Sequence, residues 1–167
     1  MPATYEPIAT TTLGSAASSI EFTSIPATYT DLRIVMVYSG ATTNVYVATQ
    51  FNSDTATNYS WTYMRGNGSA ASSTRGTSTS YIEVCRGNID NTTIGFGTID
   101  IFLYAGSTNK TVLASEQTDK NGAGNVGRTV GLWRSTSAIT SIKLYDYIGS
   151  NNFATGTTAT LYGILKA

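Results

Sequence analysis

The chain has 167 residues, of which 41% are hydrophobic and only 12% are charged, and ten basic side chains balance ten acidic ones. This length fits one domain with its own core. The neutral balance argues against nucleic-acid binding, which needs a clustered basic field, and the chain has no run of about 20 apolar residues that could span a membrane.

Short segments rich in Val, Ile, Thr and Tyr alternate with Gly, Asn and Ser clusters, which is the pattern of β-strands joined by turns. In chain order the predicted strands are Ser19–Ile25, Asp31–Tyr38, Asn44–Phe51, Tyr59–Arg65, Ser80–Arg86, Ile94–Tyr104, Lys110–Glu116, Thr129–Arg134, Ile139–Tyr147 and Thr157–Leu165. No segment carries the apolar stripe of a helix. The small residues of Leu13–Ser19 predict a loop or bulge.

Three strands have informative side-chain patterns. Asp31–Tyr38 is apolar on nearly both faces, which predicts a central strand. Asn44–Phe51 alternates, with its odd-numbered residues on one face. Ile94–Tyr104 is predicted to be the longest strand, with Ile101 and Leu103 on the same face.

Ten or so strands without intervening helices predict an all-β fold: one antiparallel β-sandwich domain of jelly-roll type over residues 1–167. The two longest irregular stretches, Gly66–Thr79 and Thr118–Arg128, are predicted to be projecting loops.

The sequence offers little catalytic chemistry. It contains no histidine, which removes Ser-His-Asp and Cys-His catalysis and imidazole metal sites. Glycoside hydrolysis would need two carboxylates across a cleft, and the ten acidic residues are scattered. We therefore predict no enzyme and assign no catalytic, cofactor-binding or metal-binding residue.

Cys85 is the only cysteine, so no disulfide forms within the chain. Its place in an apolar strand predicts a buried, inert thiol. The N-terminal residues MPATYEPIATTT lack the basic start and apolar centre of a signal peptide, so we expect a soluble product made in the cytoplasm.

The segment FNSDTATNYS sets Asn52, Asp54 and Asn58 between two predicted strands. It lacks the spacing of an EF-hand calcium loop and brings only one charged oxygen. Asn and Asp also bond to their own backbone in turns, so a structural turn is favoured over a calcium site.

Two further patterns allow a functional and a structural interpretation. The glycine-rich Lys120–Gly127 has no phosphate-loop motif and is predicted to be a hairpin loop. Tyr59, Trp61 and Tyr63 share one strand face and could stack on sugars or anchor an interface, but core packing is favoured for them and for Trp133.

Four blocks of the chain resemble a family of small virion proteins of tailed bacteriophages, including cyanophages. The blocks are YEPIATTTLGSAASSIEFTSIPATYTDLRIV (Tyr5–Val35), FNSDTATNYSWTYMRGNGSAASS (Phe51–Ser73), GLWRSTSAITSIKL (Gly131–Leu144) and NFATGTTATLYGI (Asn152–Ile164). They cover most of the chain in order and are structural rather than catalytic signatures.

The resemblance implies a virion structural protein made in the host cytoplasm. The favoured position is the capsid surface, where a decoration (cement) protein would bind the major capsid protein and strengthen the shell. A tail or tail-fibre component that binds host surface glycans is the alternative. We also expect a cyclic homo-oligomer, most simply a trimer, with contacts from low-charge faces and from the Ala159–Ala167 segment.

Overall fold

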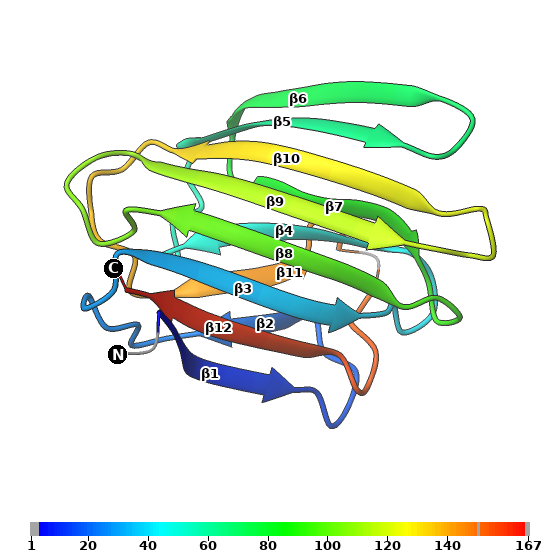
Figure 1. Ribbon diagram of the computed structural model, residues 1–167, viewed down its shortest axis with the longest axis horizontal. Helices are drawn as coiled ribbons and strands as arrows, with labels where there is room; N and C mark the ends of the chain where they lie inside the picture. Colours follow the sequence, from blue (N-terminus) through cyan, green and yellow to red (C-terminus); the bar gives the residue numbers. More distant parts are fainter. Residues whose placement is uncertain (1–3, 150, 166–167) are drawn as a thin grey trace.

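The computed structural model describes residues 4–149 and 151–165, which form strands and no α-helix. The strands are β1 (Tyr5–Thr12), β2 (Ser19–Phe22), β3 (Asp31–Tyr38), β4 (Val45–Phe51), β5 (Tyr59–Gly66), β6 (Ala71–Thr79), β7 (Ile82–Ile89), β8 (Gly95–Phe102), β9 (Lys110–Thr118), β10 (Asn125–Trp133), β11 (Ile142–Asp146) and β12 (Thr158–Ile164). Figure 1 shows two layers, with the larger sheet in front.

The strand order is that of a jelly roll with two inserted hairpins. The large sheet has the order β1-β12-β3-β8-β9-β10-β5-β6, and the small sheet has the order β2-β11-β4-β7. Without the β5–β6 and β9–β10 hairpins, each sheet keeps four strands, and successive strands alternate between the sheets except from β4 to β7. This confirms the predicted antiparallel jelly-roll sandwich. The hairpins widen only the large sheet.

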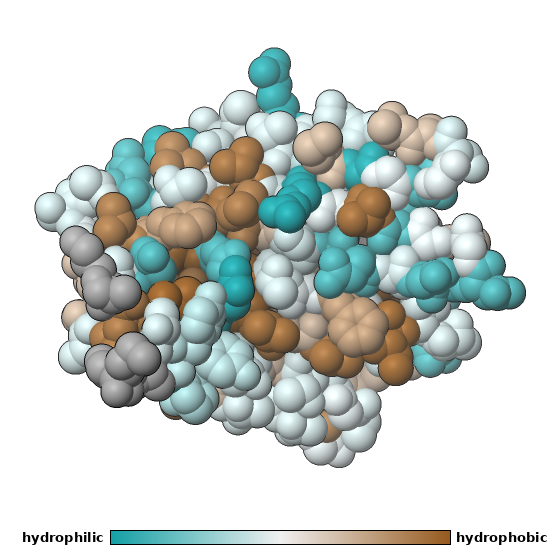
Figure 2. All heavy atoms as spheres, viewed as in Figure 1, coloured by the Kyte–Doolittle hydropathy of each residue, from teal (hydrophilic) through white to brown (hydrophobic). Residues whose placement is uncertain are grey.

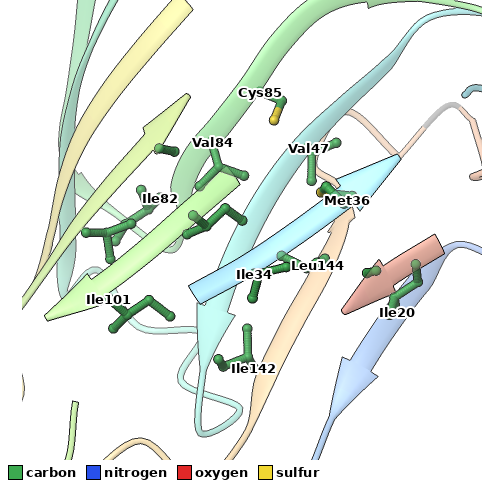
Figure 3. Close-up of a cluster of buried hydrophobic side chains, with 14 of the residues drawn as sticks. Ile20, Ile34, Met36, Val47, Ile82, Val84, Cys85, Ile101, Ile142 and Leu144 are labelled. Carbon is green, nitrogen blue, oxygen red and sulfur yellow. The ribbon is translucent and has the colours of Figure 1, made fainter. Parts of the chain in front are cut away.

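The core lies between the sheets and follows from the two-residue period of a strand. In β3, for example, Leu32, Ile34 and Met36 are buried whereas Val35 and Val37 face outward. Figure 3 shows side chains of both sheets meeting in the core, with labels on Ile20, Ile34, Met36, Val47, Ile82, Val84, Cys85, Ile101, Ile142 and Leu144.

Glycines let β7 approach the large sheet closely. A methyl group added at Gly131 of β10 would lie 2.5 Å from Ile82 Cγ2, and one added at Gly97 of β8 would lie 3.1 Å from Cys85 Sγ. At these two positions, the lack of a side chain leaves the room that β7 needs to pack against the large sheet.

All ten predicted strands are present, with ends that differ by a few residues, but two strands were missed. The predicted loop Gly66–Thr79 is wrong because its second part forms β6, and Thr118–Arg128 is a loop only over residues 119–124. The missed strands β1 and β6 are the edges of the large sheet. They bury too little surface for apolar alternation to appear in their sequences.

Two strand predictions need correction. β3 is an interior strand as predicted, but it buries only one apolar face, since Val35 and Val37 are exposed. β8 is not the longest strand and ends at Phe102, because Leu103 adopts a left-handed conformation with φ 49°. Leu103 is therefore exposed while Tyr104 is buried.

Candidate functional site

The predicted turn at Asn52, Asp54 and Asn58 is confirmed by its hydrogen bonds. Asn52 Oδ1 accepts hydrogen bonds from Thr140 N (2.8 Å) and Ser141 N (3.1 Å), and Asn52 Nδ2 donates to a backbone carbonyl at 2.8 Å. Asp54 Oδ2 accepts hydrogen bonds from Asn58 Nδ2 (2.9 Å) and Trp133 Nε1 (2.7 Å). These oxygens tie the β4–β5 connection to the segments around β10 and β11.

The aromatic stripe of β5 faces the core, as predicted. Tyr59, Trp61 and Tyr63 are all buried. Trp133 is also buried, and its ring stacks on Tyr59 at a centroid distance of 6.2 Å and packs against Phe51 at 5.5 Å. These rings therefore stabilise the sandwich and are not open to a ligand.

Two carboxylates are buried and held by protein donors. Tyr63 Oη and the backbone N–H of Arg86 donate to Glu116. Glu83 Oε2 accepts a hydrogen bond from Tyr147 Oη at 2.8 Å, and its Oε1 lies 3.4 Å from Arg86 Nε. Both are 1% exposed, so neither is positioned to meet a polymeric substrate. That the protein is not an enzyme stays a prediction.

Cys85 is buried and unpaired, as predicted, and burial raises the pKa of its thiol. Within the described ranges, no cluster of three or more His, Cys, Asp or Glu residues could hold a metal ion. Among the same residues, no helix is long and apolar enough to cross a membrane.

The outer surface of the large sheet, here called the large-sheet face, carries most of the exposed apolar side chains. They are Val35 and Val37 of β3, Phe96 and Phe102 of β8, Val126 and Val130 of β10, and Met64 of β5, with exposed fractions between 38% and 62%. Figure 2, viewed onto this face, shows brown apolar side chains spread over several strands. Such an extended apolar surface is characteristic of a contact with another macromolecule.

The large-sheet face carries few charges. Arg33 of β3 lies opposite Asp100 of β8, and their side chains pair in a bidentate ion pair with Nη2–Oδ2 at 2.9 Å. Arg75 of β6 and Arg128 of β10 are exposed, and neither has an ion-pair partner in the part of the chain that the structure describes. The face is therefore apolar with a basic end near β6.

Shallow hollows lie at that end. One, of about 220 Å³, is lined by Met64, Ala71 and Val126 and by the arginines at positions 65 and 128. A second, of about 470 Å³, lies farther along β5, β6 and β10 and includes Arg75 and Val130. Both are wide open, which suits a protein surface better than a small molecule.

The outer surface of the small sheet differs in chemistry. We call it the tyrosine face, after Tyr46, Tyr81, Tyr145 and Tyr147, which are all half-buried. Among described residues, β2, β4, β7 and β11 carry none of the exposed large apolar side chains. The outer face of the large sheet thus carries exposed aliphatic and phenylalanine side chains, whereas that of the small sheet carries half-buried tyrosines and polar residues.

The chain matches no protein-family model, no curated protein and no solved structure. The resemblance to bacteriophage virion proteins therefore stays a prediction from the sequence.

The sequence did not reveal either outer face. The apolar side chains on the outward face of β3 were an indication of the large-sheet face, but from the sequence they were assigned to a second buried face. In the segment Ala159–Ala167, proposed for oligomer contacts, Ala159 and Leu161 point into the core, and the oligomer contacts stay a prediction. Residues 166–167 of that segment lie outside the described residues.

Proposed function

We propose that this protein is a bacteriophage virion structural protein that decorates the outer capsid surface and binds the major capsid protein through the large-sheet face. The observation that carries the proposal is the outer surface of β3 and β8, on which Val35, Val37, Phe96 and Phe102 are exposed. There Val37 lies directly opposite Phe96, and the one ion pair, Arg33–Asp100, is internally compensated.

Burying this surface supplies the binding energy without catalysis. Apolar area removed from water contributes about 25 cal/mol per Å² before the costs of association. A ligand that binds the assembled shell and not its separated subunits stabilises the shell by mass action. Arg75 and Arg128, which have no ion-pair partner, favour an acidic patch on the capsid protein. Without acidic partners, burying each guanidinium in the contact would remove its water and give no ion pair in return.

A cyclic trimer suits the same role. Three linked copies engage equivalent capsid edges together, and effective concentration makes three weak contacts strong. Closed symmetry also avoids open-ended association of the apolar face. The jelly-roll fold occurs in capsid and lectin domains, which agrees with the proposal only as an analogy of fold.

A binding experiment on bare capsids of the phage tests this proposal. Phe96→Asp places a charge beside Val37 on the large-sheet face, and Phe96 is 48% exposed, so we expect a folded variant. Wild type should co-sediment with capsids at saturation, and the variant should bind at least about 10-fold more weakly, since charges buried in interfaces cost several kcal/mol.

Ile148→Asp is the matched control, because Ile148 is 52% exposed in the turn after β11, outside the large-sheet face. It should bind like wild type. Wild-type protein that stays monomeric and does not bind capsids would reject the decoration proposal. Binding to isolated tails instead would favour the tail alternative.

A further inference from the structure

The two edges of the large sheet differ in how well they are protected against pairing. β1, at one edge, carries Pro7, which has no N–H to donate, and its register with β12 shifts between Pro7 and Ala9. A proline and a bulge protect an edge strand against pairing with another chain. β6, at the other edge, has neither proline nor lysine, and its register with β5 is regular from Ala71 to Gly76. β6 is therefore the edge that is open to a further strand.

The alternation of hydrogen bonds in an antiparallel pair determines which backbone groups of β6 are unpaired. At the β5–β6 turn, Asn67 N donates to Ala70 O at 3.2 Å, so every second pair from there, including Tyr63–Thr74, is hydrogen-bonded. The β6 residues of the intervening pairs direct their N–H and C=O groups away from β5. These residues are Ala71, Ser73 and Arg75. No other strand of the described chain lies on that side of β6.

The charged side chains of the neighbouring strands are all basic. Strands β5, β6 and β10 carry three arginines and no acidic residue. Arg75 lies opposite Thr62 of β5, which lies opposite Val130 of β10, so a row of side chains leads from the large-sheet face to the edge. The hollow of about 470 Å³ runs along this row. A strand added to β6 would place a side chain beside Arg75, and an acidic one would compensate its charge.

We propose that β6 accepts a ninth strand of the large sheet from the major capsid protein, an extended segment with acidic side chains that pairs with Ala71–Gly76. The partner comes from the proposed function, on which this inference rests. Backbone hydrogen bonds hold the added strand, and its acidic side chains fix its position against Arg75. The added strand continues the sheet at the end of the large-sheet face, so one partner can occupy both.

A second copy of this chain is a poorer occupant of the edge. Pairing two β6 strands would bring two arginine-bearing segments together with no acidic residue in either. Pairing β6 with β1 of another copy would meet the proline and the bulge of β1. An acidic segment of a different protein meets neither obstacle.

Hydrogen–deuterium exchange of wild type, free and bound to bare capsids of the phage, tests the added strand. On binding, the amides of Ala71–Gly76 should exchange at least about 10-fold more slowly, because the N–H groups at the open edge become hydrogen-bonded. Peptides that cover Tyr5–Thr12 of β1 are the internal control and should keep their exchange rate.

Ser73→Pro tests the pairing itself. It removes an N–H that points away from β5 and keeps the hydrogen bonds to β5, so we expect a folded variant that binds capsids at least about 10-fold more weakly. Thr10→Pro is the matched control on β1, since Leu13 N donates to Thr157 O and alternation therefore directs Thr10 N away from β12. It should bind as wild type does. Thermal unfolding establishes that both variants are folded, and the exchange experiment needs no variant.

Arg75 tests the acidic character of the added segment. Arg75→Glu should weaken capsid binding at least about 10-fold, whereas Arg75→Lys keeps the positive charge and should stay within about 3-fold. Arg75 is exposed, so we expect both variants to fold.

The outcomes separate this inference from the proposed function. Wild type that binds capsids without protection of Ala71–Gly76, or folded Ser73→Pro that binds as wild type does, overturns the added strand and leaves the proposed function standing. Arg75→Glu that binds as wild type does overturns the acidic segment. Wild type that does not bind capsids rejects the proposed function and this inference with it.

Discussion

Gly131 of β10 lies against β7 with no room for a side chain. An added Cβ would meet three atoms of Ile82 within 3.1 Å, and Ile82 is itself fully buried. We predict that Gly131→Ala destabilises the protein by about 1–3 kcal/mol through overpacking.

Gly66→Ala is the matched control, since Gly66 also lies in a strand of the large sheet and a methyl group there meets nothing within 4 Å. It should be neutral or slightly stabilising. Urea unfolding compares the two variants. Equal stability of Gly131→Ala and wild type would contradict the close approach of β7.

Asp54 provides a second residue-scale prediction. Burial alone would raise the pKa of Asp54, but hydrogen bonds from Asn58, Trp133 and the Ala56 amide lower it below the ordinary value of 3.8. A lowered pKa in the folded state means that ionised Asp54 stabilises the fold above pH 3.8, and that this contribution is lost as the pH falls through the folded-state pKa.

Asp54→Asn should therefore cost about 1–2 kcal/mol at pH 7, where it removes a charge-assisted acceptor of the Trp133 hydrogen bond. The difference from wild type should shrink in acid, where Asp54 is protonated. Unfolding measured at pH 7 and near pH 3 checks this. A difference that is equal at both pH values would mean that ionisation of Asp54 contributes nothing.

At the scale of elements, β6 is the least protected strand. Its residues Ala71–Thr79 are exposed almost throughout, and it pairs only with β5 at the edge of the large sheet. We predict that in the isolated protein the amides of β6 exchange with deuterium much faster than those of the interior strands β3 and β8, which open only with global unfolding. Equal exchange rates for the amides of β6, β3 and β8 would contradict the prediction that β6 is an unprotected edge strand.

The same elements show how far sequence could predict the fold. Strands with one buried apolar face, such as β5 and β11, were found because apolar side chains at every second position indicate burial on one side. The edge strands β1 and β6 were missed because exposed strands of Thr, Ser and Ala resemble loops. The end of β8 was placed too late because nothing in the sequence indicated the left-handed conformation of Leu103.

At the scale of the whole molecule, the candidate sites depend on long-range pairing. The sequence showed Tyr145 and Tyr147 two residues apart, but not that Tyr46 and Tyr81 lie beside them. Likewise, the apolar pairing of Val37 with Phe96 is set by the β3–β8 register. The sequence also predicted contacts through low-charge faces, and this stays a prediction.

The central claim, that this jelly roll decorates a capsid through its large sheet, is tested most directly by a cryo-electron microscopy map of the virion. The account predicts density for this jelly-roll fold on the outer shell surface, arranged about a three-fold axis, with the outer side of β3, β8 and β10 against the major capsid protein. Density for this fold in the tail, or a particle that contains none of this protein, would contradict the claim.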